Sequence, residues 1–180
     1  MVKDNKKIQV SQDTLYQYII EHGLTVLRLA EYMGVNNSTI TNYFRHNIGF
    51  DGKPYSFTGS SIERLNDTLV KIAEDIRGCL LTFGSDRTYT NQRGKTYDPA
   101  LVPLIKNGPG RYFNLNALCE RVLGWNKSKK HNILETVTGR AYGCISKDDV
   151  DRINAEIRAV ADTLAGWEVV AGGDGIKSEE

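Results

Sequence analysis

Hydrophobic residues recur along much of this chain at spacings of three and four, which is the period of a helix with one buried face. The clearest example is 62–78, where apolar residues fall at i, i+3, i+7, i+10 and i+14. An earlier segment begins after Ser11 and stops at Gly23, and serine and glycine are common at the two ends of a helix. The pattern predicts helices over about 12–22, 25–33, 37–45 and 61–77.

The second half of the chain repeats the pattern of the first. Segments 62–78 and 150–166 align without a gap, and so do segments 24–35 and 114–125. The two long segments share the identical pairs Arg64/Arg152, Asn66/Asn154, Ala73/Ala161 and Gly78/Gly166. Shared order, spacing and stop signals indicate two copies of one helical unit.

We therefore expect an all-α protein of two tandem five-helix-type units, 1–83 and 98–170, joined by a polar linker over 84–97. The tail 171–180 is glycine-rich and acidic, and we expect it to be disordered. A small hairpin in each unit is a further option, because Asp51-Gly52 is a hairpin-type turn between apolar and aromatic residues. An irregular loop fits this stretch equally well.

The segment 26–45 has the side chains required where two helices cross closely around a tight turn. Ala30 is small where the first helix must approach the second, and Gly34 tolerates the positive φ of the turn. Apolar residues flank the turn, and Ile40 and Tyr43 are spaced so that the second helix buries them. These positions together predict a helix-turn-helix.

The outward face of the second helix carries short polar groups instead of the Glu and Lys that usually cover a solvated helix. Amide and guanidinium groups can read the edges of adenine and guanine, and hydroxyl groups can bind phosphates. A merely solvated face is the competing interpretation. The candidate DNA-contacting residues of this helix are Asn36, Asn37, Ser38, Thr39, Thr41, Asn42 and Arg45.

The stretch LAEYMGVNNSTITNYF is followed by a loop containing GKP and then by a helix beginning IERL. Over about 11–78 this arrangement resembles the phage-repressor class of helix-turn-helix domains, the Cro and lambda-repressor-like family. The resemblance implies a compact five-helix domain and a dimeric or pseudo-dimeric transcriptional regulator, on a phage or a mobile element. It also implies that the helix over 37–45 enters the major groove.

The second copy departs from this pattern. Glu120 stands where Ala30 does and Lys130 where Ile40 does, and neither suits a tight core contact. The segment NKSKKH (126–131) is the most basic short stretch of the chain. Either it binds DNA, mostly through phosphates, or this copy has become a packing partner. The candidate contacts here are Lys127, Ser128, Lys129 and Lys130.

Composition narrows the remaining classes of function. A formal net charge of +1 argues neither for nor against nucleic acid, because a local basic face can coexist with an acidic remainder. The apolar runs are too short to span a bilayer, and the N-terminal residues lack a signal-like apolar region. The three cysteines form no close pair, which suggests a reducing compartment. We therefore expect a cytoplasmic protein without a membrane partner.

No set of side chains has the pattern of a catalytic, metal or cofactor site. Cys119, His131 and Cys144 are too far apart in sequence for paired zinc ligands, and Cys79 and Cys119 fall on or beside apolar stripes as core thiols. We expect no enzyme activity, no metal and no cofactor. The expected partner is double-stranded DNA, with self-association or a protein partner as further options.

A second hypothesis comes from a different class. The chain would be a protein-interaction adaptor that kept the helical scaffold and lost DNA binding, which the low net charge and the diverged second copy favour. A small hydrolase or nuclease accessory domain is a weaker third hypothesis, because the sequence lacks a carboxylate cluster.

Overall fold

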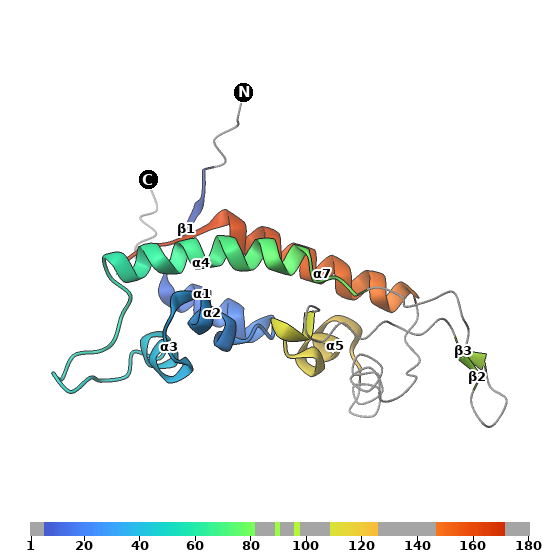
Figure 1. Cartoon of the computed structure of the whole chain (residues 1–180), viewed down its shortest axis with the longest axis horizontal. Helices are drawn as coiled ribbons and strands as arrows, with labels where there is room; N and C mark the ends of the chain where they lie inside the picture. The colour runs from blue at the N-terminus through green and yellow to red at the C-terminus, as the bar shows by residue number, and fades with distance from the viewer. Residues whose placement is uncertain (1–5, 82–88, 91–95, 98–108, 126–146, 172–180) are drawn as a thin grey trace, which may run out of the picture.

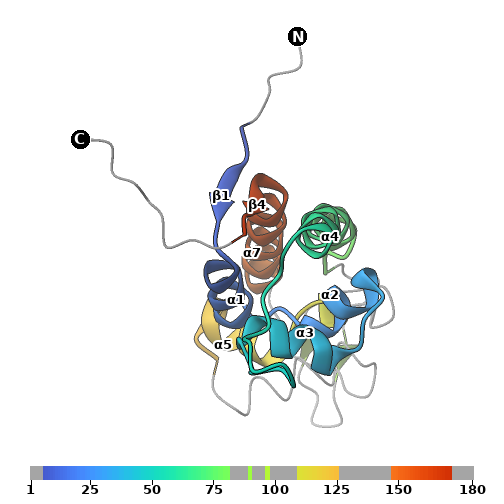
Figure 2. The same cartoon turned by 90° about the vertical axis from the view of Figure 1, so that its left-hand side faces the viewer.

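The computed structural model of the chain describes residues 6–81, 89–90, 96–97, 109–125 and 147–171. Within these ranges the helices are α1 (Gln12–Glu21), α2 (Val26–Met33), α3 (Asn37–Phe44), α4 (Ser60–Arg77), α5 (Leu115–Leu123) and α7 (Lys147–Gly166). Helices α4 and α7 lie side by side and run in opposite directions, with α1, α2, α3 and α5 on one face of this pair (Figures 1 and 2). No helix in the described ranges is long and apolar enough to cross a membrane.

The helices of the first copy begin and end close to the predicted residues. Ser11 is the N-cap of α1, and its side-chain oxygen accepts a hydrogen bond from the backbone N–H of Thr14 at 3.1 Å. Gly34 ends α2 with a φ of +66°, a left-handed conformation that glycine adopts without strain. Gly124 ends α5 in the same way, with a φ of +63°. The repeated glycine therefore has the same conformational role in both copies.

Two small sheets accompany the helices in the described ranges. β1 (Ile8–Val10) pairs in parallel with β4 (Trp167–Val169), and β2 (Tyr89–Thr90) pairs antiparallel with β3 (Thr96–Tyr97) inside the segment expected to be a linker. The chain is mainly helical, as expected, and these short strands are added to its helices. Strands of two or three residues are too short for an alternating pattern to reveal them in a sequence.

The two copies share one continuous hydrophobic core, centred on α4 and α7. Leu65 of α4 and Ile153 of α7 are completely buried. Ala73 and Ala161, which occupy matching positions in the repeat, are completely buried as well. Their small side chains suit the close approach of two long helices.

The repeated asparagines link the copies to each other. The Asn66 side chain accepts a hydrogen bond from the backbone N–H of Val169 at 2.7 Å and donates one to its carbonyl oxygen at 2.9 Å. Asn154 forms the same pair of bonds with Leu81, at 2.8 and 2.9 Å. Each asparagine therefore binds the backbone that follows the long helix of the other copy, as a pseudo-twofold arrangement requires.

The repeated arginines serve their own copies. Arg64 donates to the carbonyl oxygen of Met33 at 3.1 Å, and Arg152 donates to that of Val122 at 2.5 Å. These carbonyls lie in the last turns of α2 and α5, where helix geometry leaves them without an intrahelical partner. The identical arginines thus cap equivalent helices.

A second junction joins the segments that precede α2 and α5. Leu24 faces Phe113 in an isolated antiparallel bridge, flanked by backbone hydrogen bonds of 2.7 and 2.8 Å. Gly23 fits closely here, because a Cβ atom added to it would lie 3.1 Å from the Cβ of Ala117. The two copies therefore meet at both their short and their long helices.

A polar cluster completes this contact between the copies. His22 Nδ1 lies 2.8 Å from the Glu156 carboxylate on α7, and Arg121 of α5 binds the same carboxylate oxygen. The His22 ring stacks on Tyr18, with ring centres 3.9 Å apart, and Tyr18 meets Trp167 edge to face. Burial and, to a smaller extent, the Arg121 charge lower the pKa of His22.

Candidate nucleic-acid interface

Helices α2 and α3 are joined by a three-residue turn and pack on each other. The N-cap of α3 is Asn36, whose side-chain oxygen accepts hydrogen bonds from the backbone N–H of Thr39 at 2.7 Å, from the Thr39 hydroxyl at 2.7 Å and from the Ser38 hydroxyl at 2.6 Å. This network fixes the first turn of α3 and orients both hydroxyl groups.

The buried side of α3 consists of Ile40 and Phe44. The expectation that Tyr43 would be buried with Ile40 is wrong, because Tyr43 is half-buried and Phe44 takes the core position. Ile40 and Phe44 are four positions apart, which keeps both on one face of a helix. Tyr43 instead stacks on Phe57, with ring centres 4.9 Å apart.

Aromatic contacts hold α3 between α1 and the segment that follows α3. Phe44 stacks on Tyr16 of α1 at 5.1 Å and meets Phe57 edge to face at 5.3 Å. The buried Gln12 binds the backbone of Tyr43 through its amide N–H and accepts from the N–H of Phe57 at 3.0 Å. The orientation of α3 is therefore set by contacts on both of its sides.

The other face of α3 points outward and carries the residues expected to contact DNA. Asn36, Asn37, Ser38 and Arg45 are exposed, whereas Thr39, Thr41 and Asn42 are half-buried. Several of these groups already form hydrogen bonds, such as that from the Thr41 hydroxyl to the Asn37 carbonyl oxygen at 2.8 Å. A hydroxyl group has one hydrogen to donate, so Ser38, Thr39 and Thr41 must release these bonds before they donate to a phosphate. As oriented, they are acceptors for an approaching ligand.

Arg45 is the cationic group of this face. It follows α3 directly, is exposed, and donates from Nε to the Tyr16 hydroxyl oxygen at 3.3 Å. That hydrogen bond raises the pKa of the Arg45 guanidinium, a group that is charged at neutral pH in any protein. Asp13, the acidic residue of the first turn of α1, lies 2.7 Å from the Nε2 of His46.

The described residues of the second copy include only part of the corresponding site. Glu120, which stands where Ala30 does, is exposed on α5, whereas Ala30 is buried. Trp125 follows the turn and is buried. The basic segment expected to contact DNA lies outside the described residues; it contains Lys127, Ser128, Lys129 and Lys130.

The segment between α3 and α4 contains a tip at Asp51-Gly52. The sequence fits either a hairpin or an irregular loop here. An isolated antiparallel bridge joins Ile48 to Pro54, and the turn at Gly52 has a φ of +74°. The tip is thus a minimal hairpin, and its segment extends away from the helices (Figure 1). Phe50 lies in this tip and is fully exposed, although no sequence motif marks it as a functional residue.

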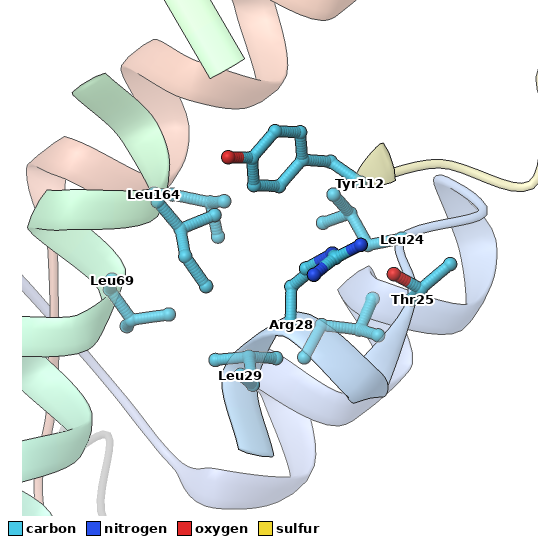
Figure 3. A pocket seen from close by; sticks show the side chains of 9 residues that line it. Leu24, Thr25, Arg28, Leu29, Leu69, Tyr112 and Leu164 are labelled. Atoms are coloured by element: carbon cyan, nitrogen blue, oxygen red, sulfur yellow. The ribbon is translucent and has the colours of Figure 1, made fainter. Parts of the chain in front are cut away.

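A small cavity lies between the two copies (Figure 3). It is lined by residues that include Leu24, Thr25, Arg28, Leu69, Tyr112 and Leu164. Its volume of about 10 Å³ leaves room for one water molecule, far less than the ~300–1,000 Å³ of typical ligand pockets. The buried Thr25 hydroxyl, which lines the cavity, has no hydrogen-bond partner. This cavity is too small for a metabolite or effector.

The described residues contain no group of three or more His, Cys, Asp or Glu side chains that could hold a metal ion. Cys79 and Cys119 lie in the buried core. Burial is the main cause that raises the pKa of the Cys79 thiol, which makes this group a weaker nucleophile at neutral pH.

Comparisons with protein-family models, with curated proteins and with solved structures found no match to this chain. The candidate interface on α3 therefore depends on its own geometry and chemistry.

Proposed function

We propose that this protein binds double-stranded DNA in a sequence-specific manner, with α3 in the major groove, and that it is a transcriptional regulator. The observation that carries the proposal is the division of α3 into two faces. Ile40 and Phe44 anchor one face in the core, and the other presents amide, hydroxyl and guanidinium groups to solvent. Such groups can read base edges and bind phosphates.

The contacts that fix the position of α3 support the same proposal. A recognition helix must be held firmly, because base readout depends on the position of a few side chains. The Asn36 cap, the Phe44 ring contacts and the Gln12 hydrogen bonds provide this support from three directions. The resemblance of 11–78 to phage repressors favours regulation on a phage or a mobile element.

The pseudo-twofold arrangement of the chain suggests a role for the second copy. Repressors of this class place two equivalent helices about one DNA turn apart, ~34 Å, on two half-sites. We propose that the second copy supplies the other contact, mainly to phosphates through Lys127, Lys129 and Lys130. The preferred DNA site would then consist of two unequal halves.

The test is selection of bound duplexes from a random DNA pool with the full chain, followed by affinity measurements across salt concentrations. A single enriched motif and a steep salt dependence would support the proposal. The variant carrying both Asn37→Ala and Arg45→Ala should fail to enrich the motif, whereas the exposed α4 variant Lys71→Ala should enrich it. Absence of binding at low salt would refute the proposal and leave the adaptor hypothesis.

A further inference from the structure

The tip over 46–55 is held by hydrogen bonds within it and by contacts at its base. The backbone N–H of Gly49 donates to the Lys53 carbonyl oxygen at 2.8 Å, and that of Tyr55 donates to the Asn47 carbonyl oxygen at 3.0 Å. The Asp51 carboxylate accepts from the Lys53 N–H at 3.1 Å. The base of the tip is fixed in turn, since the Tyr55 ring packs on Tyr43 of α3 at 5.4 Å and the Asn47 amide donates to Asn42 at 2.8 Å.

Two apolar side chains of this tip are exposed to solvent. Phe50 is 111% exposed and Ile48 is 67% exposed. Their neighbours Asn47, Asp51 and Lys53 are exposed polar residues. A protein-binding patch needs roughly 800 Å² on each partner, and one aromatic side chain supplies only ~200 Å². A small apolar group of one ring and one aliphatic side chain on an otherwise polar tip is better suited to insertion between stacked bases than to a protein surface.

The tip is also within reach of a second groove. Phe50 lies five residues after Arg45, which allows at most ~17 Å of extended chain. The major groove of DNA is ~12 Å wide. This upper limit allows a tip that leaves the end of α3 to cross one phosphate backbone and reach the neighbouring minor groove. The exposed Arg45 and Lys53 on either side of Phe50 suit that backbone.

We propose that Phe50, together with Ile48, is an apolar wedge that enters the minor groove beside the α3 site and partly unstacks one base step. This inference rests on the proposed DNA binding by α3. Wedges of this kind kink the duplex toward the major groove. The step involved should be a flexible pyrimidine–purine step such as TA or CA, because these steps unstack at the lowest cost.

The test uses the full chain and the duplex most enriched in the selection, labelled with a donor and an acceptor dye at its two ends. In a second version of the duplex, 2-aminopurine replaces an adenine at each pyrimidine–purine step in turn. Wild-type protein should shorten the end-to-end distance and raise the fluorescence of 2-aminopurine at one step. Phe50→Ala should abolish both signals and weaken binding between about fivefold and a hundredfold.

Ile20→Ala is the matched control, since Ile20 is an exposed apolar residue on α1 (56%) outside the proposed interface. It should bend DNA like the wild type. Phe50→Ala should keep the wild-type circular dichroism and melting temperature, because the Phe50 side chain is exposed and is not part of the core.

Three results would overturn the wedge. Equal bending by wild type and Phe50→Ala would do so, and so would a straight duplex with both proteins. Self-association of the wild type that Phe50→Ala abolishes, measured by sedimentation equilibrium, would assign the ring to a protein contact. A wild-type chain that enriches no duplex would refute the proposed function itself, whereas tight binding to an unbent duplex would refute only the wedge.

Discussion

The side-chain amide of Asn154 forms two hydrogen bonds with the backbone of Leu81, accepting from its N–H at 2.8 Å and donating to its carbonyl oxygen at 2.9 Å. Both residues are buried, and they belong to different copies of the repeat. Asn66 and Val169 form the matching pair across the pseudo-twofold relation. An amide that satisfies both backbone groups of a buried residue has a structural task that no aliphatic residue can perform.

Replacement of Asn154 by alanine should lower the free energy of unfolding by about 2–4 kcal/mol, because two buried backbone groups lose their partners. Asn66→Ala should cost less, about 1–2 kcal/mol, since Asn66 is half-buried and water can enter the space that its amide leaves. Urea unfolding followed by circular dichroism measures both. Equal losses of unfolding free energy in the two variants would show that the different burial of Asn154 and Asn66 has no effect on the loss.

Replacement of Gly34 by alanine should cost about 1–2 kcal/mol of stability, the price of a left-handed conformation with a side chain. The space around Gly34 is open, so this cost is purely conformational. Gly23→Ala should cost more, because the new Cβ would also press on Ala117 at 3.1 Å. Thermal unfolding of the two variants compares them directly. A Gly23→Ala variant as stable as Gly34→Ala would mean that the α1–α5 junction relaxes.

Acid should destabilise the fold in part through His22. Its pKa is lowered from the ordinary value of 6.5, so the folded state favours neutral histidine and the unfolded state binds the proton more readily. The stabilisation is present above pH 6.5 and is lost as the pH falls below that value. His22→Gln should therefore reduce the slope of stability against pH between about pH 7 and pH 5.

Urea unfolding of wild type and His22→Gln at several pH values gives the difference, in which the carboxylate contributions cancel. A wild type that gains stability relative to His22→Gln in acid would show that the Glu156 carboxylate outweighs burial and Arg121.

Loss of a single group on the α3 face should weaken specific DNA binding. We expect Asn37→Ala and Arg45→Ala each to cost about 1–3 kcal/mol on the preferred site. Lys71→Ala, which removes an exposed charge from α4, should leave the affinity within error of the wild type. Fluorescence anisotropy with the selected duplex measures all three. Equal affinities for all the proteins would remove α3 from the interface.

Local signals made much of the fold predictable from the sequence. The cap at Ser11, the left-handed Gly34 and the apolar stripe of α4 all depend on residues within a few positions of each other, and the structure agrees with them. The choice between Tyr43 and Phe44 was less accessible. Both are aromatic neighbours on one helix, and the Tyr16 and Phe57 rings that select Phe44 lie far away in sequence.

Long-range pairing accounts for what the sequence did not predict. The parallel pairing of β1 with β4 joins segments more than 150 residues apart, and the sequence of neither strand indicates its partner. The hydrogen bonds of Asn66 and Asn154 could not be predicted for the same reason, because their partners lie far away in sequence. The repeat showed only that asparagine occurs at the same position in both copies. The exposure of Phe50 was also unpredictable, since an apolar residue beside a turn is usually assigned to the core.

The exchanged asparagine contacts have a consequence for how this sequence can change over generations. Asn66 and Asn154 each form hydrogen bonds with the backbone of the other copy. A substitution in one half is therefore selected by its fit to the other half, and the two copies must diverge together at these positions. Surface segments outside the shared core carry no such restraint, which leaves each copy free to acquire its own ligand chemistry there.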